Sequence, residues 1–468
     1  MSTQYSYNDI EIILPALRQL LGDRLSLDQD ILDDHGHDVS RHSSQAPQAV
    51  TFPKSTQEVS EIVRLCNQHR VPVIPFGTGT AVEGGVVALY GGVSIDLTQM
   101  NQVLAINVAD ADATVQAGVT RYQLNAALQE QSTGLLFTVD PGADASIGGM
   151  AATRASGSSA VRYGTMRDNT LALTVVLADG EIIKTGGRAR KSSAGYDLTH
   201  LMVGSEGTLG VITEVTVKLY PQPEQVSSAI CPFETIESAV EAVLEILASG
   251  IPVARIELLD DVQIKAVNQY SGLNNAPKPT IFFEFHGSPN HVTEQTTRAK
   301  EISSRHGGDE FQWAVDQQQR DRLWQARYDS FHAVMALREN AVGYVTDVCV
   351  PISQLARCFL KAKEIVKEAS LPAPVFGHVG DGNFHVVFPL DPDNPTELEE
   401  VTTYHQQLIG MALAAGGTCT GEHGIGLGKR HALEQEHGNA VNTMRQIKQA
   451  LDPFHICLLY TSPSPRDS

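Results

Sequence analysis

Four segments rich in glycine and other small residues occur in the first half of the chain, and strand-like runs separate them. They span residues 76–85, 140–150, 155–169 and 204–213. Small residues are needed where backbone lies against a flat ring system or a pyrophosphate, because a side chain would block the approach. One such loop would be an ordinary turn, and the first matches neither a P-loop nor a GxGxxG fingerprint. Four together predict one extended cofactor that is bound largely through backbone.

The first loop follows an alternation of strand and helix patterns. Residues 49–53 and 71–75 are short apolar runs of the kind found in buried strands. Between them, Ser55 precedes Glu58 by three residues, which is a typical helix N-terminus, and apolar residues then recur at helical spacing. We therefore predict a strand, a helix and a second strand that leads into the loop at 76–85.

The second half of the chain contains two glycine-rich loops that bear histidines. The first places His378 and His385 across a Gly-Asp-Gly turn, and the second contains Glu422 and His423. Two imidazole nitrogens and one carboxylate oxygen make a three-ligand set for a divalent metal, with coordination positions open for a substrate. His423 is then placed to serve as a general base. A single histidine would more often be a hydrogen-bonded loop residue, but two such loops favour the functional interpretation.

The length and the ends of the chain bound its architecture and its compartment. A chain of 468 residues is too long for one core, so we expect two or three domains. No apolar run reaches the length of a membrane span. The first residues lack the basic and apolar regions of a signal peptide and are not rich in arginine, as a mitochondrial transit peptide would be. These features predict a cytoplasmic protein.

The charge and the cysteines narrow the classes of partner. The formal net charge is −20, from 34 basic and 54 acidic residues, which argues against nucleic acid and anionic lipid as main partners and suits a basic protein. None of the six cysteines forms a CxxC pair, so a zinc knuckle or a redox dithiol is not expected. Their spacing fits reduced, mostly buried thiols.

Long strings of residues in both halves carry a resemblance to a known family. They lie at 140–145, 160–169, 346–353, 377–385 and 417–430. The chain resembles the flavin-binding domain and the FAD-linked oxidase C-terminal domain of the vanillyl-alcohol oxidase and p-cresol methylhydroxylase superfamily, and within it the D-lactate dehydrogenase (cytochrome) branch. The resemblance implies an α+β fold, in which two α+β subdomains hold FAD and a third α+β domain closes over the isoalloxazine ring.

The resemblance also implies a division of the chain. A helical lead-in would occupy residues 1–45, the FAD-binding domain 46–223, and the C-terminal substrate and metal domain 224–457. Within the lead-in, an apolar stripe at near-helical spacing ends at Gly22. Residues 458–468 are rich in proline and serine and replace the ending of the family, which is typical of a read-through or assembly scar.

The resemblance places FAD on the small-residue loops. Some relatives attach the flavin covalently through histidine or cysteine, and the loop at 76–85 contains neither, so non-covalent FAD is expected. The expected cofactor-binding residues are Phe76, Gly77, Thr78, Gly79, Thr80, Gly84, Gly85, Pro141, Gly142, Ser146, Gly149, Met150, Thr153, Ser156, Gly157, Ala160, Tyr163, Gly164, Glu206, Gly210 and Ile212.

A substrate clamp follows from the family's Trp-x-x-Arg pattern. It is matched by Trp324 and Arg327, and the arginine would hold the substrate carboxylate with its planar fork. The alternative is an ion pair on a helix surface. Relatives specific for D-2-hydroxyglutarate carry a lysine just before the Asp-Val of the next strand, and residues 344–348 contain none. A substrate with a single carboxylate is therefore expected.

The activity that the resemblance implies is oxidation of D-lactate, or of a related D-2-hydroxy monocarboxylate, to the 2-oxo acid. The substrate hydroxyl and carboxylate would bind Zn²⁺ or Mn²⁺ held by His378, His385 and Glu422. His423 would take the hydroxyl proton and Arg327 would clamp the carboxylate. The Cα hydride would pass to flavin N5, since FAD supplies the redox chemistry.

Electrons would then leave FAD for cytochrome c or a quinone, as part of lactate catabolism. No Rossmann fingerprint for a nicotinamide is present. The alternatives are a glycolate or D-2-hydroxyglutarate dehydrogenase of the same superfamily, and a flavin- or metal-binding protein without catalysis. A homodimer and a peripheral attachment to the inner membrane stay open.

Overall fold

The computed structural model describes residues 7–457, so the predicted tail at 458–468 lies outside the described residues. Two compact units form. Of the described chain, unit 1 contains residues 7–156, 164–222 and 422–457, and unit 2 contains 157–163 and 223–421. The C-terminal segment from Glu422 onward thus folds with the N-terminal part. These units differ from the predicted domains, because residues 157–163 fold with unit 2 and residues 422–457 fold with unit 1. The domain boundaries stay a prediction.

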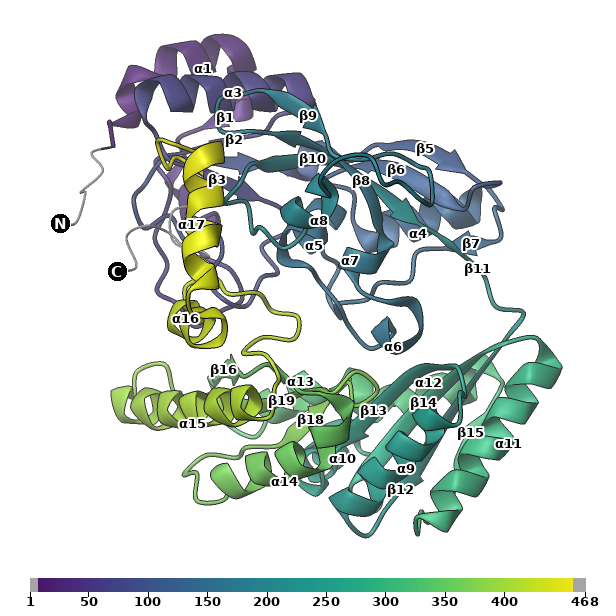
Figure 1. Ribbon diagram of the computed structural model, residues 1–468. Coiled ribbons are helices and arrows are strands. Elements are labelled where there is room, and N and C mark those ends of the chain that lie inside the picture. The colour runs from purple at the N-terminus through teal and green to yellow at the C-terminus, as the bar shows by residue number, and fades with distance from the viewer. Residues whose placement is uncertain (1–6, 458–468) are drawn as a thin grey trace. The chain divides into compact units, whose positions relative to one another are not determined.

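Two sheets organise unit 1 (Figure 1). In the first, three parallel strands and one antiparallel strand have the order β1-β2-β4-β3. The second is an antiparallel sheet in the order β5-β6-β10-β8-β9, beside a short β7–β11 pair. The strands are β1 (Leu25–Ser26), β2 (Ala49–Thr51), β3 (Val73–Phe76), β4 (Val93–Asp96), β5 (Val103–Asn107), β6 (Asp112–Gln116), β7 (Leu135–Leu136), β8 (Thr170–Val176), β9 (Ile182–Lys184), β10 (Val211–Lys218) and β11 (Tyr220–Pro221).

The helices of unit 1 begin and end at clear sequence signals. The predicted strand, helix and strand are confirmed, since α3 begins after Ser55, whose hydroxyl accepts from the Glu58 amide. α1 ends at Gly22, which has a positive φ of 60°. The helices are α1 (Leu14–Leu21), α2 (Gln29–Asp34), α3 (Thr56–His69), α4 (Arg121–Glu130), α5 (Ile147–Thr153), α7 (Met166–Asn169), α8 (Leu198–Met202), α16 (Arg430–His437) and α17 (Ala440–Leu451), with 3₁₀ turns at Ile10–Ile12, Gly22–Arg24 and Leu97–Gln99.

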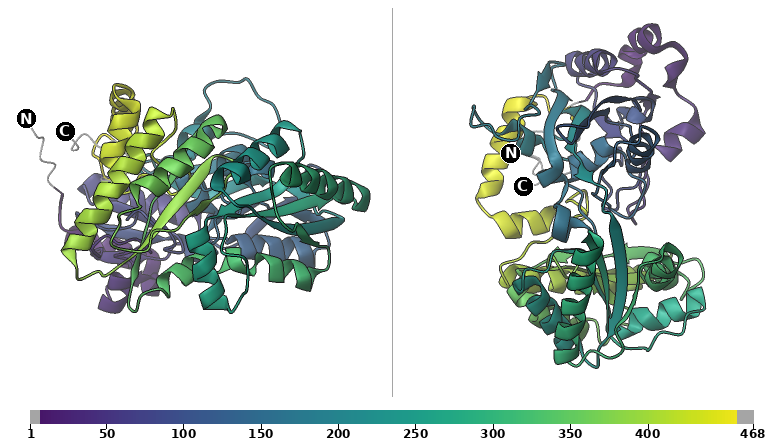
Figure 2. Two further views of the ribbon diagram at one scale, coloured as in Figure 1. Left: turned by 90° about the horizontal axis from the view of Figure 1, so that it is seen from below. Right: turned by 90° about the vertical axis from the view of Figure 1, so that its right-hand side faces the viewer.

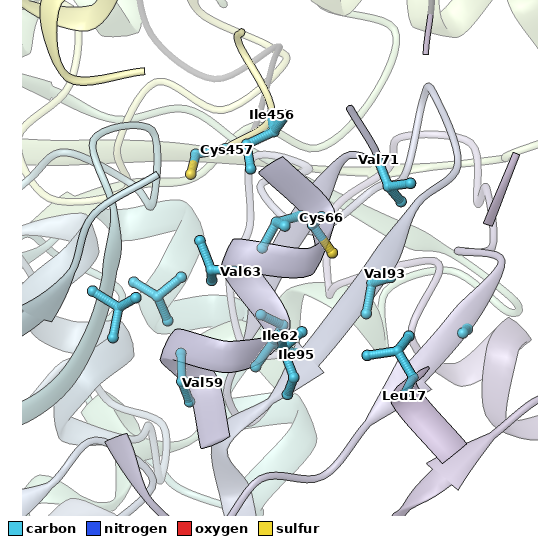
Figure 3. Packing of buried hydrophobic residues seen from close by; sticks show 14 of the residues in the cluster. Leu17, Val59, Ile62, Val63, Cys66, Val71, Val93, Ile95, Ile456 and Cys457 are labelled. Carbon is cyan, nitrogen blue, oxygen red and sulfur yellow. The ribbon is translucent and has the colours of Figure 1, made fainter. Parts of the chain in front are cut away.

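The core around α3 joins residues from both ends of the chain (Figure 3). Val59, Ile62, Val63 and Cys66 of α3 pack with Leu17 of α1, with Val93 and Ile95 of β4, and with Ile456 and Cys457. The Val73 amide donates to the Ile456 carbonyl at 2.7 Å, so the last described residues run alongside β3. The C-terminal segment is therefore part of this core.

A buried ion pair fixes the same segment. The ammonium of Lys448, whose residue is 5% exposed, donates to the carboxylate of Asp452 at 2.5 Å and to the carbonyls of Thr208 and Cys457 at 2.6 and 2.7 Å. Asp452 also accepts from the Ile456 and Cys457 amides. Every partner is hydrogen-bonded, as a buried charge requires.

Unit 2 is built on one antiparallel sheet with helices on both faces (Figures 1 and 2). The strand order is β15-β12-β14-β13-β18-β19-β16, and β17 also pairs with β19. The strands are β12 (Gln225–Pro232), β13 (Val253–Leu259), β14 (Thr280–Gly287), β15 (Gln312–Ala314), β16 (Val342–Val345), β17 (Val348–Cys349), β18 (Val375–Gly377) and β19 (Asn383–Leu390).

The two faces of this sheet are covered by different helices. α10, α12 and α13 share a core with Phe282, Leu259 and Phe376. α9, α11, α14 and α15 pack against one another and against other positions of the sheet. The bounds are α6 (Ala160–Tyr163), α9 (Ile236–Ala248), α10 (Asp261–Ser271), α11 (Pro289–Arg305), α12 (Gln317–Tyr328), α13 (Ser330–Met335), α14 (Leu355–Ile365) and α15 (Pro395–Ala414), with a 3₁₀ turn at Ile352–Gln354. Among the described helices of both units, none has the length and hydropathy needed to cross a membrane.

The Lys448–Asp452 pair predicts a large effect on stability. Lys448→Met would leave Asp452 as a buried carboxylate without its cation, which should cost about 3–5 kcal/mol in the free energy of unfolding measured in urea. Lys265→Met is the matched control. It removes the ion pair between Lys265 and Asp261, which has the same four-residue spacing, but the Lys265 side chain is 60% exposed. This substitution should cost at most about 0.5 kcal/mol. Equal losses in the two variants would contradict the role of the buried pair.

Candidate active site

A cavity of about 230 Å³ in unit 1 is lined by the predicted loops. Its wall also contains Glu422 and His423 from the C-terminal segment, so the small-residue loops and the predicted base belong to one unit. The predicted cofactor-binding residues in the wall are Phe76, Gly77, Thr78, Gly79, Thr80, Gly85, Pro141, Ser146, Gly149, Met150, Thr153, Ser156, Glu206, Gly210 and Ile212.

Close backbone packing explains why small residues line this cavity. A Cβ atom on Gly77 would lie 2.4 Å from the hydroxyl oxygen of Ser146. That hydroxyl caps α5 by accepting from the Gly149 amide at 3.3 Å. A Cβ on Gly148 would lie 2.5 Å from the Cβ of Ala117. At these positions the wall is made of backbone and short side chains, which fits a large flat cofactor held through backbone.

Other predicted cofactor residues lie elsewhere. Gly84, Gly142, Gly157, Ala160, Tyr163 and Gly164 do not line the cavity. Gly157, Ala160 and Tyr163 fold with unit 2, where the Tyr163 hydroxyl lies 2.7 Å from Nδ1 of His286. Gly85 does line the cavity, but its amide donates to the carboxylate of Asp38 at 3.0 Å. Roles of these residues in cofactor binding stay a prediction.

Glu206 has a partner that the sequence did not reveal. Its carboxylate accepts from the amides of Ile425 and Gly426 at 2.7 and 2.9 Å. Burial raises the pKa of Glu206, and these two amides act against that rise. The contact holds the loop that carries Glu422 and His423 in the cavity wall.

In unit 2, His378 and His385 come together because of strand register. β18 and β19 pair so that Phe376 lies opposite His385. His378 is two residues beyond Phe376 on the same face, which makes it the diagonal neighbour of His385. The two imidazole centroids are 5.6 Å apart and their planes are nearly perpendicular. Both residues are buried.

Hydrogen bonds fix the tautomers of both imidazoles. Nδ1 of His385 donates to the Thr346 carbonyl at 3.0 Å. Nδ1 of His378 lies 2.7 Å from a carboxylate oxygen of Glu257. In the neutral rings Nε2 then carries the lone pair, which is the arrangement found in metal-binding histidines. The two donors thus fit the predicted metal.

Arg327 binds the same carboxylate as His378. Its Nε donates to the second oxygen of Glu257 at 2.8 Å, and its guanidinium lies over the Phe376 ring. Arg327 therefore does form an ion pair, as the alternative interpretation expected. Its partner, however, is the fully buried Glu257 of β13 and not a residue on a helix surface. Burial alone would raise the pKa of Glu257, yet His378 and Arg327 outweigh it and lower that pKa to about 2.

Asp347 holds the end of unit 2. Its carboxylate accepts from the Thr420 hydroxyl and the Gly421 amide, both at 2.8 Å, and from the Asn383 amide group at 2.7 Å. Gly421 is the last residue of this unit, and the chain continues directly to Glu422.

Glu257 and Asp347 are the acidic residues that sequence reasoning missed as site residues. For Glu257 a signal exists, since Arg255 and Glu257 alternate with apolar residues in a strand that is otherwise hydrophobic. For Asp347 only its position beside the predicted motifs was visible. Neither pattern identifies the partner, because the partners lie 36 to 121 residues away.

The fold has known counterparts. A crystal structure of p-cresol methylhydroxylase with substrate bound superposes with a TM-score of 0.83, over 100% of this chain and 99% of that chain, at 18% identity. This likeness confirms the predicted α+β fold. The sequence-family model of the FAD binding domain matches residues 47–186, and the sequence-family model of the C-terminal domain of FAD linked oxidases matches residues 222–458. The chain belongs to the FAD-linked oxidase family.

Two relatives that cover most of this chain are named as D-lactate dehydrogenases. The probable D-lactate dehydrogenase, mitochondrial, of Danio rerio is 50% identical over 96% of this chain and 90% of its own length. The D-lactate dehydrogenase [cytochrome], mitochondrial, of Arabidopsis thaliana is 44% identical over 95% of this chain and 78% of its own length. The resemblance stated from the sequence is thereby confirmed.

The expected location is contradicted. The sequence predicted a cytoplasmic protein from the lack of targeting signals at its start, but both of these relatives are named as mitochondrial. The start of a chain is weak evidence for location, because targeting segments are removed or vary independently of the fold.

The packing at Gly77 predicts its importance for FAD. Gly77→Ala would push the loop away from Ser146, since the new Cβ would lie 2.4 Å from its hydroxyl oxygen. Overpacking of this kind costs about 1–3 kcal/mol. We expect a lower ratio of flavin to protein absorbance after gel filtration. Gly187→Ala is the control, because nothing lies within 4 Å of a Cβ at that exposed position. Equal flavin retention in both variants would contradict the packing argument.

Proposed function

We propose that this protein is an FAD-dependent dehydrogenase that oxidises D-lactate, or a closely related D-2-hydroxy monocarboxylate, to the 2-oxo acid. The observation that carries the proposal is near full-length identity of 50% and 44% to proteins named D-lactate dehydrogenase. The second of these is named for cytochrome, which supports cytochrome c as the acceptor, with a quinone as the alternative. Homodimer formation stays a prediction of the sequence.

Arg327 is the proposed clamp for the substrate carboxylate. Its Nε is used by Glu257, and among the described residues its two terminal amino groups make no hydrogen bond. Those two groups form the edge of the guanidinium that binds a carboxylate through two parallel hydrogen bonds. The side chain is 20% exposed, so a ligand can reach it. Binding there would orient Cα of the substrate.

His378, His385 and Glu422 are the proposed metal ligands. Two fixed imidazoles from unit 2 and a carboxylate that follows Gly421 in the chain offer nitrogen and oxygen donors suited to Zn²⁺ and tolerant of Mn²⁺. Such an ion, when bound, would lower the pKa of the substrate hydroxyl. Glu257 and the Thr346 carbonyl would keep both imidazoles in the required tautomer.

His423 is the proposed general base. It lines the cavity of unit 1 beside Glu422, and Glu206 fixes its loop through the Ile425 and Gly426 amides. His423 would remove the hydroxyl proton of the substrate, while FAD, when bound, would accept the hydride from Cα.

Reduction of the bound flavin tests the function directly. In anaerobic stopped-flow experiments, D-lactate should bleach the flavin absorbance of the purified protein, and L-lactate should not, because the clamp presents only one face of Cα. Faster bleaching by glycolate or D-2-hydroxyglutarate would favour the related dehydrogenases. No bleaching by any of the four acids would favour a protein that binds flavin without catalysis and would refute the proposal.

The role of His423 is tested by its removal. His423→Ala should slow flavin reduction by D-lactate by about 10² to 10⁴, the usual contribution of a general base. His431→Ala, which alters an exposed histidine of α16, is the control and should leave the rate unchanged. A near-native rate in His423→Ala would remove the assignment.

A further inference from the structure

Glu257 joins the two functional groups of unit 2 through its two oxygens. One oxygen lies 2.7 Å from Nδ1 of His378, and the other accepts from Nε of Arg327 at 2.8 Å. The carboxylate comes from β13 and is fully buried. A buried carboxylate is costly unless charged or hydrogen-bonding partners surround it, and Glu257 has one such partner on each oxygen.

We propose that Glu257 is a positioning residue that sets, with one carboxylate, both the substrate clamp Arg327 and the metal ligand His378. This inference rests on the proposed function of those two residues. It adds that the clamp and the metal ligand depend on a single side chain that contacts neither substrate nor metal.

The effect on Arg327 is to select one edge of its guanidinium. An unrestrained arginine loses substantial rotamer freedom when it binds a ligand. Because Nε is already bonded to Glu257, the planar group is held before the substrate arrives, and among the described residues its terminal amino groups make no hydrogen bond. The substrate then binds without the full cost of ordering the side chain.

The effect on His378 is to fix its tautomer and ring orientation. A carboxylate on Nδ1 keeps the proton there, leaves Nε2 as the ligand atom and increases its basicity. His385 receives its restraint from a neutral carbonyl, that of Thr346. His378 is therefore the imidazole whose donor strength depends on a charge.

A second carboxylate on the same sheet face provides the comparison. Glu284 lies opposite Arg255 in the β13–β14 register. Two residues along each strand, and on the same face, Phe282 lies opposite Glu257. Glu284 is also buried, contacts Arg255 at 3.5 Å and lies 2.8 Å from Nε2 of His286. Glu284 thus has the same kinds of partner as Glu257, but neither partner is a proposed clamp or ligand.

The experiment compares Glu257→Gln with Glu284→Gln in the flavin-loaded protein, using two readouts that need no turnover. The first is metal content after dialysis against graded chelator, measured by elemental analysis. The second is the dissociation constant of propionate, a monocarboxylate without the hydroxyl, titrated by its perturbation of the flavin spectrum. Flavin reduction of the wild-type protein by D-lactate is measured in parallel, which tests the proposed function separately.

Glu257→Gln should weaken metal binding by about ten- to a hundredfold and propionate binding by about two- to tenfold, while Glu284→Gln should change neither. Wild-type affinities in Glu257→Gln would overturn the inference even if D-lactate reduces the wild-type flavin. If Glu257→Gln does not retain flavin, Glu257→Asp replaces it. The shortened carboxylate cannot reach both partners, so unchanged affinities for both probes would equally overturn the inference.

Discussion

The site in unit 1 depends on one half-buried carboxylate. Glu206 lies in a glycine-rich loop and accepts from the amides of Ile425 and Gly426, which lie 219 and 220 residues later. The acid needs these amides because burial without donors is costly, and the loop needs the acid because its amides are likewise removed from water. The contact places Glu422 and His423 in the wall of the cavity that the small residues form.

Unit 2 applies a similar principle on a sheet. Antiparallel register aligns Glu257, His378 and His385 on one face of three neighbouring strands, and α12 supplies Arg327 to the same place. The hydrogen-bonded ladder fixes the backbone, so the side chains need only short reaches to meet. The strands are rigid, and one carboxylate bonds both the proposed clamp and a proposed metal ligand. This arrangement suits a site in which small displacements of the side chains are costly.

Sequence reasoning recovered the parts that depend on local chemistry. The Ser55 cap, the end of α1 at Gly22 and the small residues of the cavity wall follow from rules that act over a few residues. The roles of Glu257 and Asp347 did not follow, because a buried acid in an apolar strand does not show which distant group satisfies it. The location was also wrong, since targeting leaves no imprint on the fold.

The sequence by itself determined the kind of chemistry. Glycines where backbone must approach closely, histidines in glycine-rich turns and an arginine after a tryptophan are constraints that residue type alone expresses. Only the tertiary structure decided that residues from Glu422 onward complete the N-terminal unit, and that one carboxylate serves Arg327 and His378 together. These outcomes depend on register and on the burial of charge, which arise when distant segments pack and which no short stretch of sequence contains.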